Sequence, residues 1–402
     1  MKVLQINSVC GTGSTGRIVT DIHKILIGQG HESYIAYGRG KEIKIETAMR
    51  IGTKKDNYSH VALTRLFDKH GMGSKKATLQ LIEKINRMDP DVIHLHNLHG
   101  YYINIEILFN YLKNAKHPVL WTLHDCWTFT GHCSHFDYIG CDKWKKGCRS
   151  CPQTNEYPKS ILIDNSKSNF IRKKEIFNGV DNLTLVTASK WLQNLVQESF
   201  LNNYPVKQIN NGIDLNKFKP TQSHFRRKYN IENKYLILGV AHVWGERKGF
   251  YHFIELSKRL KEDEVIVLVG LNEKQKKELP VNIIGIKRTN DIRELAEIYS
   301  AADVFVNLTL EEVMGLTNVE ALACGTPVIT YNSGGSKECV DKDCGVIIEK
   351  GDISKLVSTL KMFKKTGKSR YFEASQKRAN LYYNKNDKFL EYTKLYEQLI
   401  NT

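Results

Sequence analysis

Two glutamates, Glu312 and Glu320, lie eight residues apart around Gly315, and their types and spacing suit ligand chemistry. Residues 303–307, just before them, read as a buried strand. Residues 319–325, which overlap the second glutamate, read as a short helix that ends at a glycine. A further strand and a Gly-Gly loop follow. This order places both carboxylates at the carboxyl edge of a parallel sheet, where open α/β sheets bind their ligands.

Glu320 has a second interpretation. Thr317-Asn318-Val319-Glu320 has the sequence of a capping box, in which Glu320 would only close the start of its own helix. Glu312 has no such alternative. Replacing a capping Glu320 would lower stability, whereas replacing a ligand-binding Glu320 would selectively lower affinity.

Three glycines near the amino terminus, Gly11, Gly13 and Gly16, match the G-x-G-x-x-G pattern directly after a predicted strand. Glycines let backbone N–H groups approach a phosphate, and a helix start favours its negative charge. A dehydrogenase would also need an acidic residue at the end of the second strand, and residues 34–40 contain none. The pattern therefore indicates phosphate binding without a nicotinamide cofactor.

Length and composition exclude several classes of protein. The 402 residues, 41% of them apolar, suffice for two globular domains. No apolar run reaches the ~18–20 residues of a membrane span, and the first residues read as a strand instead of a signal peptide, so we expect a cytoplasmic protein. The net charge of +16 predicts an anionic partner: nucleic acid, an anionic membrane surface or phosphorylated substrates.

Strands and helices alternate along the chain in two series separated by a turn-rich segment that follows Pro205. In the first series, strands are expected at 2–7, 33–37, 91–95, 118–123 and 183–187, and helices near 15–29, 77–87, 104–113 and 190–199. In the second series, strands are expected at 235–241, 265–270, 283–285, 304–306, 327–330 and 346–348, and a helix at 250–260. Such alternation predicts an α/β fold with two doubly wound parallel sheets.

The glutamate pair and Asn211-Gly212-Ile213-Asp214 resemble motifs of the retaining nucleotide-sugar glycosyltransferases of family 4, and the resemblance covers nearly the whole chain. It implies the GT-B fold, in which two Rossmann-like domains face a cleft. We therefore expect residues 1–205 to form the acceptor-side domain and 206–385 the nucleotide-sugar-binding domain. The final segment, 386–402, is expected to return to the first domain as a helix.

The resemblance also assigns roles at the donor site. Glu320 would bind the ribose and Glu312 the donor sugar, next to Gly315 and Leu316. Val313-Met314 replaces the family's usual Gly-Phe, a departure that bears on the choice of sugar.

Cations and a histidine complete the predicted site. Lys248, directly before a glycine, would hold the diphosphate, with Arg247 replacing the family's arginine, because His242 stands at that position. Gly13 would face the diphosphate across the cleft. His124 would lie beside the donor sugar at the end of a strand, oriented by Asp125. His124 and Glu312 are thus the predicted catalytic residues.

The predicted activity is a hexosyltransferase-type glycosyl transfer (EC 2.4) with retention, from a UDP- or GDP-linked sugar to a glycan acceptor in cell-surface polysaccharide biosynthesis. Catalysis would rest on electrostatic stabilisation and positioning and would require no cofactor.

The acceptor is expected on a lipid carrier, and the basic surface is expected to bring the enzyme to the inner face of the membrane as a peripheral protein. No nucleic acid is expected as a partner. The alternatives are a GT-B-type epimerase or phosphorylase, or a basic zinc-containing nucleic-acid-binding protein, which would not explain the glutamate pair.

Five of the nine cysteines fall within residues 126–151, which we expect to form a loop insertion in the first domain. The last four have the spacing C-x7-C-x6-C-x2-C: Cys133, Cys141, Cys148 and Cys151. Four thiolates can form a closed tetrahedral structural zinc site. Reduced cysteines without metal are the alternative in a cytoplasmic protein.

Overall fold

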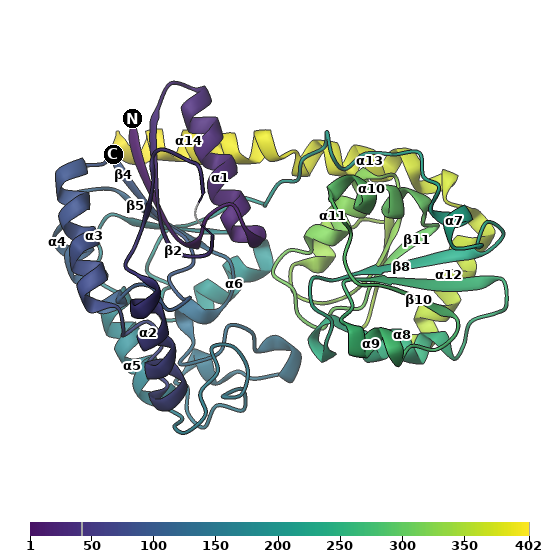
Figure 1. Ribbon diagram of the computed structural model, residues 1–402, viewed down its shortest axis with the longest axis horizontal. Helices are drawn as coiled ribbons and strands as arrows, with labels where there is room; N and C mark the ends of the chain where they lie inside the picture. Colours follow the sequence, from purple (N-terminus) through teal and green to yellow (C-terminus); the bar gives the residue numbers. More distant parts are fainter. Residues whose placement is uncertain (42, 402) are drawn as a thin grey trace. The chain divides into compact units, whose positions relative to one another are not determined.

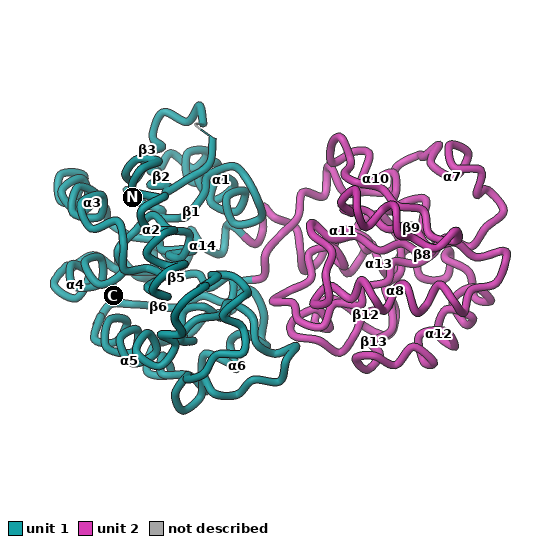
Figure 2. Tube along the Cα trace, turned by 60° about the horizontal axis from the view of Figure 1, so that its bottom comes forward, with its two compact units in different colours: residues 1–209, 389–402 teal, residues 210–388 magenta. Residues whose placement is uncertain are grey.

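The computed structural model describes residues 1–41 and 43–401, which form two compact units (Figures 1 and 2). Unit 1 comprises Met1–Ile209 together with the chain from Phe389 onward, and unit 2 comprises Asn210–Lys388. The predicted boundaries stood a few residues earlier, after 205 and after 385. The first boundary differs because Val206–Gln208 forms the last strand of the first sheet.

Unit 1 is built on a parallel sheet of seven strands in the order β3-β2-β1-β4-β5-β6-β7. The strands are β1 (Lys2–Val9), β2 (Glu32–Arg39), β3 (Ala48–Arg50), β4 (Val92–Leu95), β5 (Val119–Leu123), β6 (Leu183–Thr187) and β7 (Val206–Gln208). The central strands are buried along nearly their whole length, which explains their unbroken apolar runs. The strand order reverses between β1 and β4, so loops at the carboxyl ends of these two strands flank a crevice.

In the described part of unit 1, seven helices surround this sheet, and one of them comes from near the end of the chain (Figure 1). They are α1 (Gly13–Gly28), α2 (Lys54–Phe67), α3 (Lys75–Met88), α4 (Ile105–Asn114), α5 (Ser166–Phe177), α6 (Lys190–Glu198) and α14 (Lys385–Ile400). Apolar side chains of α14 and α1 share one buried cluster with Val3 and Val92 of the sheet. The carboxyl-terminal helix is therefore part of the core of unit 1.

Unit 2 repeats the plan with six parallel strands in the order β10-β9-β8-β11-β12-β13. The strands are β8 (Tyr235–Val240), β9 (Glu264–Val269), β10 (Ile283–Ile286), β11 (Val304–Asn307), β12 (Val328–Tyr331) and β13 (Gly345–Ile348). Its helices are α7 (Phe225–Lys228), α8 (Phe250–Ser257), α9 (Glu273–Lys277), α10 (Ile292–Ala301), α11 (Leu316–Ala323), α12 (Ile353–Thr366) and α13 (Ser369–Tyr383). Its order reverses between β8 and β11. The prediction of two Rossmann-like doubly wound sheets is thus confirmed.

Among the residues that the structure describes, none of the helices combines the length and the apolar character that crossing a bilayer requires.

Candidate active site

In unit 2 the predicted donor-binding residues gather where the strand order reverses. Lys248 ends a short 3₁₀ turn, η4 (Glu246–Lys248), in the loop after β8, and Glu312 lies in the loop after β11. Because β8 and β11 are neighbours, these two loops leave the same edge of the sheet side by side. Leu310 N donates a hydrogen bond to Arg247 O at 2.8 Å, which ties the loops together.

The Lys248 ammonium and the Glu312 carboxylate form an ion pair, and each side chain is about a quarter exposed (23% and 26%). The two residues that sequence analysis assigned to the diphosphate and to the donor sugar thus meet directly. Arg247, the proposed substitute phosphate ligand, donates from Nη1 to the backbone carbonyl of Glu311 at 3.0 Å.

Two glycines allow this close approach of loops. At Gly249, whose φ is +74°, a Cβ atom would lie 2.1 Å from Leu308 O, and at Gly334, whose φ is +51°, it would lie 2.0 Å from Glu312 O. Any side chain would push the Lys248 loop or the Glu312 loop out of place. These two positions therefore fix the backbone that presents the ion pair.

Glu320 does not cap its helix, so the capping-box interpretation is wrong. Helix α11 begins at Leu316 with Gly315 as its N-cap, and no side chain caps it. Glu320 lies more than a turn inside the helix, where its Oε2 accepts a hydrogen bond from the Tyr299 hydroxyl at 2.9 Å. The side chain is partly exposed, and a carboxylate can accept several hydrogen bonds.

The start of α11 rests on a buried polar network that the sequence did not reveal. Asn307 Nδ2 donates to Asn318 Oδ1 at 2.8 Å, and Asn318 Nδ2 donates to Ser336 O and Oγ at 3.0 Å. Thr330 Oγ1 lies 2.8 Å from Ser336 Oγ. The network joins the ends of β11 and β12 to the N-terminus of α11, the kind of helix end that attracts phosphate. The available signal was an asparagine at the end of a buried strand.

Val313 and Met314, the two residues that depart from the family pattern, both turn inward. They are 7% and 3% exposed, and the Met314 sulfur accepts the Asn211 N–H at 3.2 Å. Both side chains that depart from the family pattern are therefore buried, next to the partly exposed Glu312.

In unit 1 the glycine loop opens α1 directly after β1, as its pattern predicts. Gly11 N donates to Gly16 O at 2.9 Å, and a Cβ at Gly16 would lie 3.2 Å from Gly11 N, which explains the close turn. Gly13 is exposed at the first position of the helix. Strand β2 ends at Arg39, so an acidic ribose ligand is missing there, as the sequence indicated.

His124 follows β5 and contacts a second histidine. Its Nε2 lies 3.1 Å from His96 Nδ1, and His96 Nε2 lies 3.3 Å from Gln5 Oε1. Burial lowers the pKa of His124 to about 4, and the charge of Asp125 offsets this only in part. The imidazole is therefore neutral near pH 7 and can donate or accept one hydrogen bond.

The expectation that Asp125 orients His124 is wrong, because Asp125 contacts a different histidine. Its Oδ2 lies 2.7 Å from His99 Nε2, and its Oδ1 accepts the Trp127 N–H at 2.9 Å. Burial raises the pKa of Asp125, but His99 and other neighbours outweigh it and hold the pKa at about 2. The Tyr157 hydroxyl completes the group 3.0 Å from His99 Nδ1. Sequence analysis missed His99 and Tyr157 because they come from separate loops.

Comparison with known proteins gives one family and several relatives. Residues 221–385 match the family model "Glycosyl transferases group 1". The chain is 26% identical over 384 residues to the putative colanic acid biosynthesis glycosyl transferase WcaC of Escherichia coli, covering 90% of each chain. It is 29% identical to the Escherichia coli UDP-Gal:alpha-D-GlcNAc-diphosphoundecaprenol alpha-1,3-galactosyltransferase over 41% of this chain and 46% of that one.

Solved structures show the same fold at low identity. Sucrose-phosphate synthase of Thermosynechococcus elongatus has a TM-score of 0.73 at 15% identity, covering 100% of both chains. HepE of Anabaena, solved in complex with UDP, has a TM-score of 0.68 at 15% identity, covering 99% of this chain and 100% of the other. These matches are consistent with the predicted resemblance to family 4. The chain is a glycosyltransferase with the GT-B fold, and residues 221–385 of its second unit match the group 1 glycosyltransferase model.

Proposed function

We propose that this glycosyltransferase moves a sugar from a UDP- or GDP-linked donor to a lipid-linked glycan acceptor with retention of configuration, in the synthesis of a cell-surface polysaccharide. The relatives support the substrate classes. One is named for colanic acid biosynthesis and one for transfer from UDP-galactose to a diphosphoundecaprenol-linked sugar, and HepE was solved with UDP-glucose.

The Lys248–Glu312 pair beside the N-terminus of α11 carries the proposal. A diphosphate placed there would meet an ammonium and a helix N-terminus, the two features that favour phosphate in proteins. The same charges would stabilise the diphosphate as it leaves, so its own oxygen can take the proton of the incoming hydroxyl. Glu312 would hold the donor sugar and Glu320 the ribose. This chemistry uses no bound metal or cofactor, because positioning and electrostatics lower the barrier.

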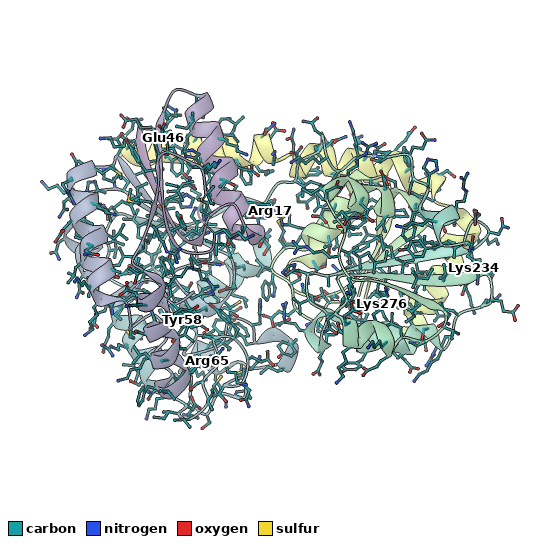
Figure 3. The ribbon with its side chains drawn as sticks, in the orientation of Figure 1. Arg17, Glu46, Tyr58, Arg65, Lys234 and Lys276 are labelled. Carbon is teal, nitrogen blue, oxygen red and sulfur yellow. The ribbon has the colours of Figure 1, made fainter. Side chains whose placement is uncertain are left out.

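An apolar patch on unit 1 supports the proposal that the acceptor is bound to a membrane. One backbone and one side-chain hydrogen bond join the end of α2 to the 161–165 loop: Ile161 N donates to Arg65 O at 2.7 Å, and Asn165 Nδ2 donates to Phe67 O at 2.8 Å. The patch consists of exposed Leu66, Phe67, Ile161, Leu162 and Ile163. Four exposed basic residues lie close to the patch residues in the sequence: Arg65, Lys69, Lys159 and Lys167. Figure 3 marks Arg65 on α2, together with Tyr58, which is 72% exposed.

Apolar side chains among basic ones fit an anionic lipid surface. The apolar groups enter the interface, and each basic residue near the lipid contributes about 1 kcal/mol. We propose that the apolar patch rests on the cytoplasmic face of the membrane while unit 1 receives the acceptor.

Calorimetry with UDP, GDP, ADP and their sugar derivatives tests the donor proposal. We expect the nucleotides of one base to bind, and we expect the sugar of the matching sugar nucleotide to be transferred to water or to an acceptor. We expect Lys248→Met to weaken the binding of every ligand that contains the diphosphate. Lys234→Met, which removes an exposed lysine elsewhere in unit 2, is the matched control (Figure 3). If no nucleotide binds the wild-type protein, the donor proposal is wrong.

A further inference from the structure

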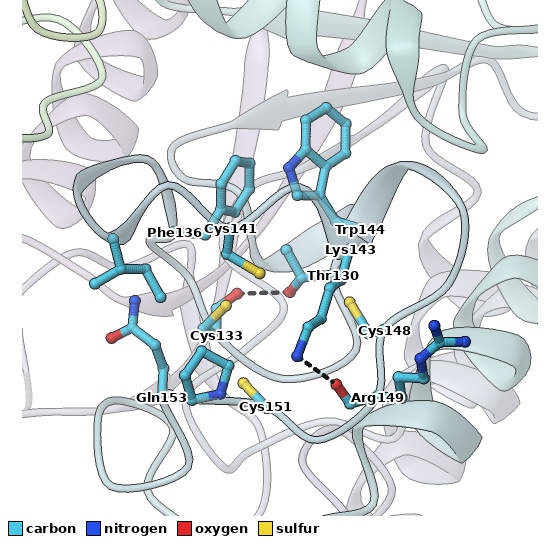
Figure 4. Close-up of a pocket in the computed structure, with 12 residues that line it drawn as sticks. Thr130, Cys133, Phe136, Cys141, Lys143, Trp144, Cys148, Arg149, Cys151 and Gln153 are labelled. Carbon is cyan, nitrogen blue, oxygen red and sulfur yellow. Dashed lines mark hydrogen bonds between the residues drawn. The ribbon is translucent and has the colours of Figure 1, made fainter.

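The cysteine-rich loop of unit 1 closes around a small cavity that glycosyl transfer does not use. The cavity is lined by Cys133, Cys141, Cys148 and Cys151, the four cysteines with regular spacing. Figure 4 shows their sulfur atoms around the pocket, and none of the cysteines forms a disulfide. The cavity has a volume of about 10 Å³ for the centre of a water molecule, which is room for about one water.

Little regular structure holds this loop. Between β5 and α5 it contains three short 3₁₀ turns, η1 (Trp127–Phe129), η2 (Asp137–Ile139) and η3 (Lys143–Lys145). An aromatic cluster packs one side, where the Trp144 ring lies 5.0 Å from that of Phe136 and 5.3 Å from that of Phe129. The thiols line the same pocket. A loop with so few ladder hydrogen bonds is the setting in which small folds use a cross-link or a metal.

One backbone N–H donor and one buried amine lie close to the sulfurs. Gly131 N donates a hydrogen bond to Cys148 Sγ at 3.2 Å, and Gly131 sits so close that a Cβ there would lie 2.7 Å from Cys148 Cβ. The buried Lys173 amine donates to the carbonyls of Trp127 and Thr130 and is close enough to Cys133 and Cys148 to interact electrostatically. An N–H donor therefore contacts one sulfur of the four-thiol group, and the amine of Lys173 lies near two of the thiols.

We propose that Cys133, Cys141, Cys148 and Cys151 bind one structural zinc ion as thiolates. Four Cys–SH groups would release four protons to form a site of charge −2, which Lys173 and Gly131 N–H would partly balance. Four protein ligands leave no open position, so the metal would stabilise the loop and take no part in the reaction. The site goes beyond the proposed glycosyl transfer and is independent of the donor and acceptor used.

Binding requires a local rearrangement of the thiols. In the arrangement described for residues 1–41 and 43–401, no group of three or more His, Cys, Asp or Glu side chains could hold a metal ion as it stands. The Cys133 thiol instead hydrogen-bonds to the Cys151 sulfur. Loss of the thiol protons removes this bond, and rotation about single bonds between staggered positions can turn the sulfurs toward the cavity.

Metal analysis of the purified full-length protein tests the proposal. We expect about one zinc ion per chain in the wild-type protein. We expect less than about 0.2 zinc per chain in Cys141→Ser and in Cys148→Ser, since each removes one of four ligands. Cys344→Ser, which alters a buried thiol in unit 2, is the matched control and should keep its zinc. Wild-type protein without metal, with iron, or with zinc that survives both loop substitutions would overturn the proposal.

A second measurement does not depend on whether the variants fold. A thiol reagent added to native wild-type protein should release one zinc ion as four thiols react. Cobalt exchanged for the zinc should give the charge-transfer absorption of a tetrahedral thiolate site. Release of zinc without thiol modification would show that the metal is bound elsewhere and would contradict the assignment.

Discussion

Glu320 lies inside α11, where its carboxylate accepts a hydrogen bond from the Tyr299 hydroxyl. We expect Glu320→Gln to raise the Kd for the preferred nucleotide about ten- to a hundredfold, because a hydrogen bond to a charged group contributes about 1.5–3 kcal/mol. Calorimetry measures this effect. Tyr299→Phe removes the partner and leaves the carboxylate, so it should change the Kd far less. Unchanged affinity in Glu320→Gln would remove this residue from the donor site.

The Lys248–Glu312 pair predicts opposite effects on binding and on catalysis. A diphosphate must compete with Glu312 for the Lys248 ammonium. Glu312→Gln should therefore tighten the binding of the nucleoside diphosphate about two- to fivefold, since partly exposed pairs contribute about 0.2–1 kcal/mol. The same change should slow sugar transfer about a hundredfold, because it removes a group that holds the reacting sugar. Isothermal titration and a transfer assay separate the two effects, and weaker diphosphate binding would contradict the competition.

His60 of α2 holds the turn between α2 and α3. Its Nε2 accepts the N–H groups of Gly71 at 3.1 Å and Gly73 at 3.3 Å, so this nitrogen must carry no proton. Burial lowers the pKa of His60 to about 4 from an ordinary 6.5. The contribution of the neutral His60 to the free energy of unfolding is complete above pH 6.5. It is lost as the pH falls toward 4, because His60 of the unfolded chain binds a proton more readily than His60 of the folded protein.

We therefore expect His60 alone to lower the free energy of unfolding by roughly 3 kcal/mol at pH 4 compared with pH 7. Thermal unfolding at a series of pH values measures this. His60→Asn should show a smaller change between the two pH values, whereas the exposed substitution His224→Asn should leave the pH profile unaltered. A His60→Asn protein with the wild-type pH dependence would contradict the role of this nitrogen.

At the scale of elements, periodicity predicted every central strand of both sheets to within two residues, because buried strands carry continuous apolar runs. It missed α2, whose exposed face carries residues such as Tyr58 and Arg65 and whose mean hydropathy is low. The signal that could have located it is the capping box formed by Thr53 and Asp56. Contacts between loops that are distant in the sequence, such as the contact of Asp125 with His99, could not be predicted from the sequence. They depend on the three-dimensional path of each loop backbone.

For the whole molecule, the charge of +16 and the apolar patch predict binding to anionic vesicles. We expect the protein to sediment with vesicles that contain anionic lipid, and less so at high salt. The double substitution Phe67→Glu and Leu162→Glu should reduce binding at least about tenfold, since it places charge in the apolar interface. Val281→Glu, at an exposed apolar position of unit 2, is the control. Equal sedimentation of all three proteins would contradict the location of the membrane surface.

Helix α14 has a consequence for the synthesis of this enzyme. Phe389, Tyr392 and Tyr396 complete a buried cluster with Val3 and Ile22, yet the whole of unit 2 is translated between them. At about 5–20 residues per second, the ribosome needs roughly ten to forty seconds to add that stretch. During this time the nascent first unit carries an apolar face that α14 does not yet cover. The buried core of the first unit is therefore completed only after the whole second unit has been synthesised.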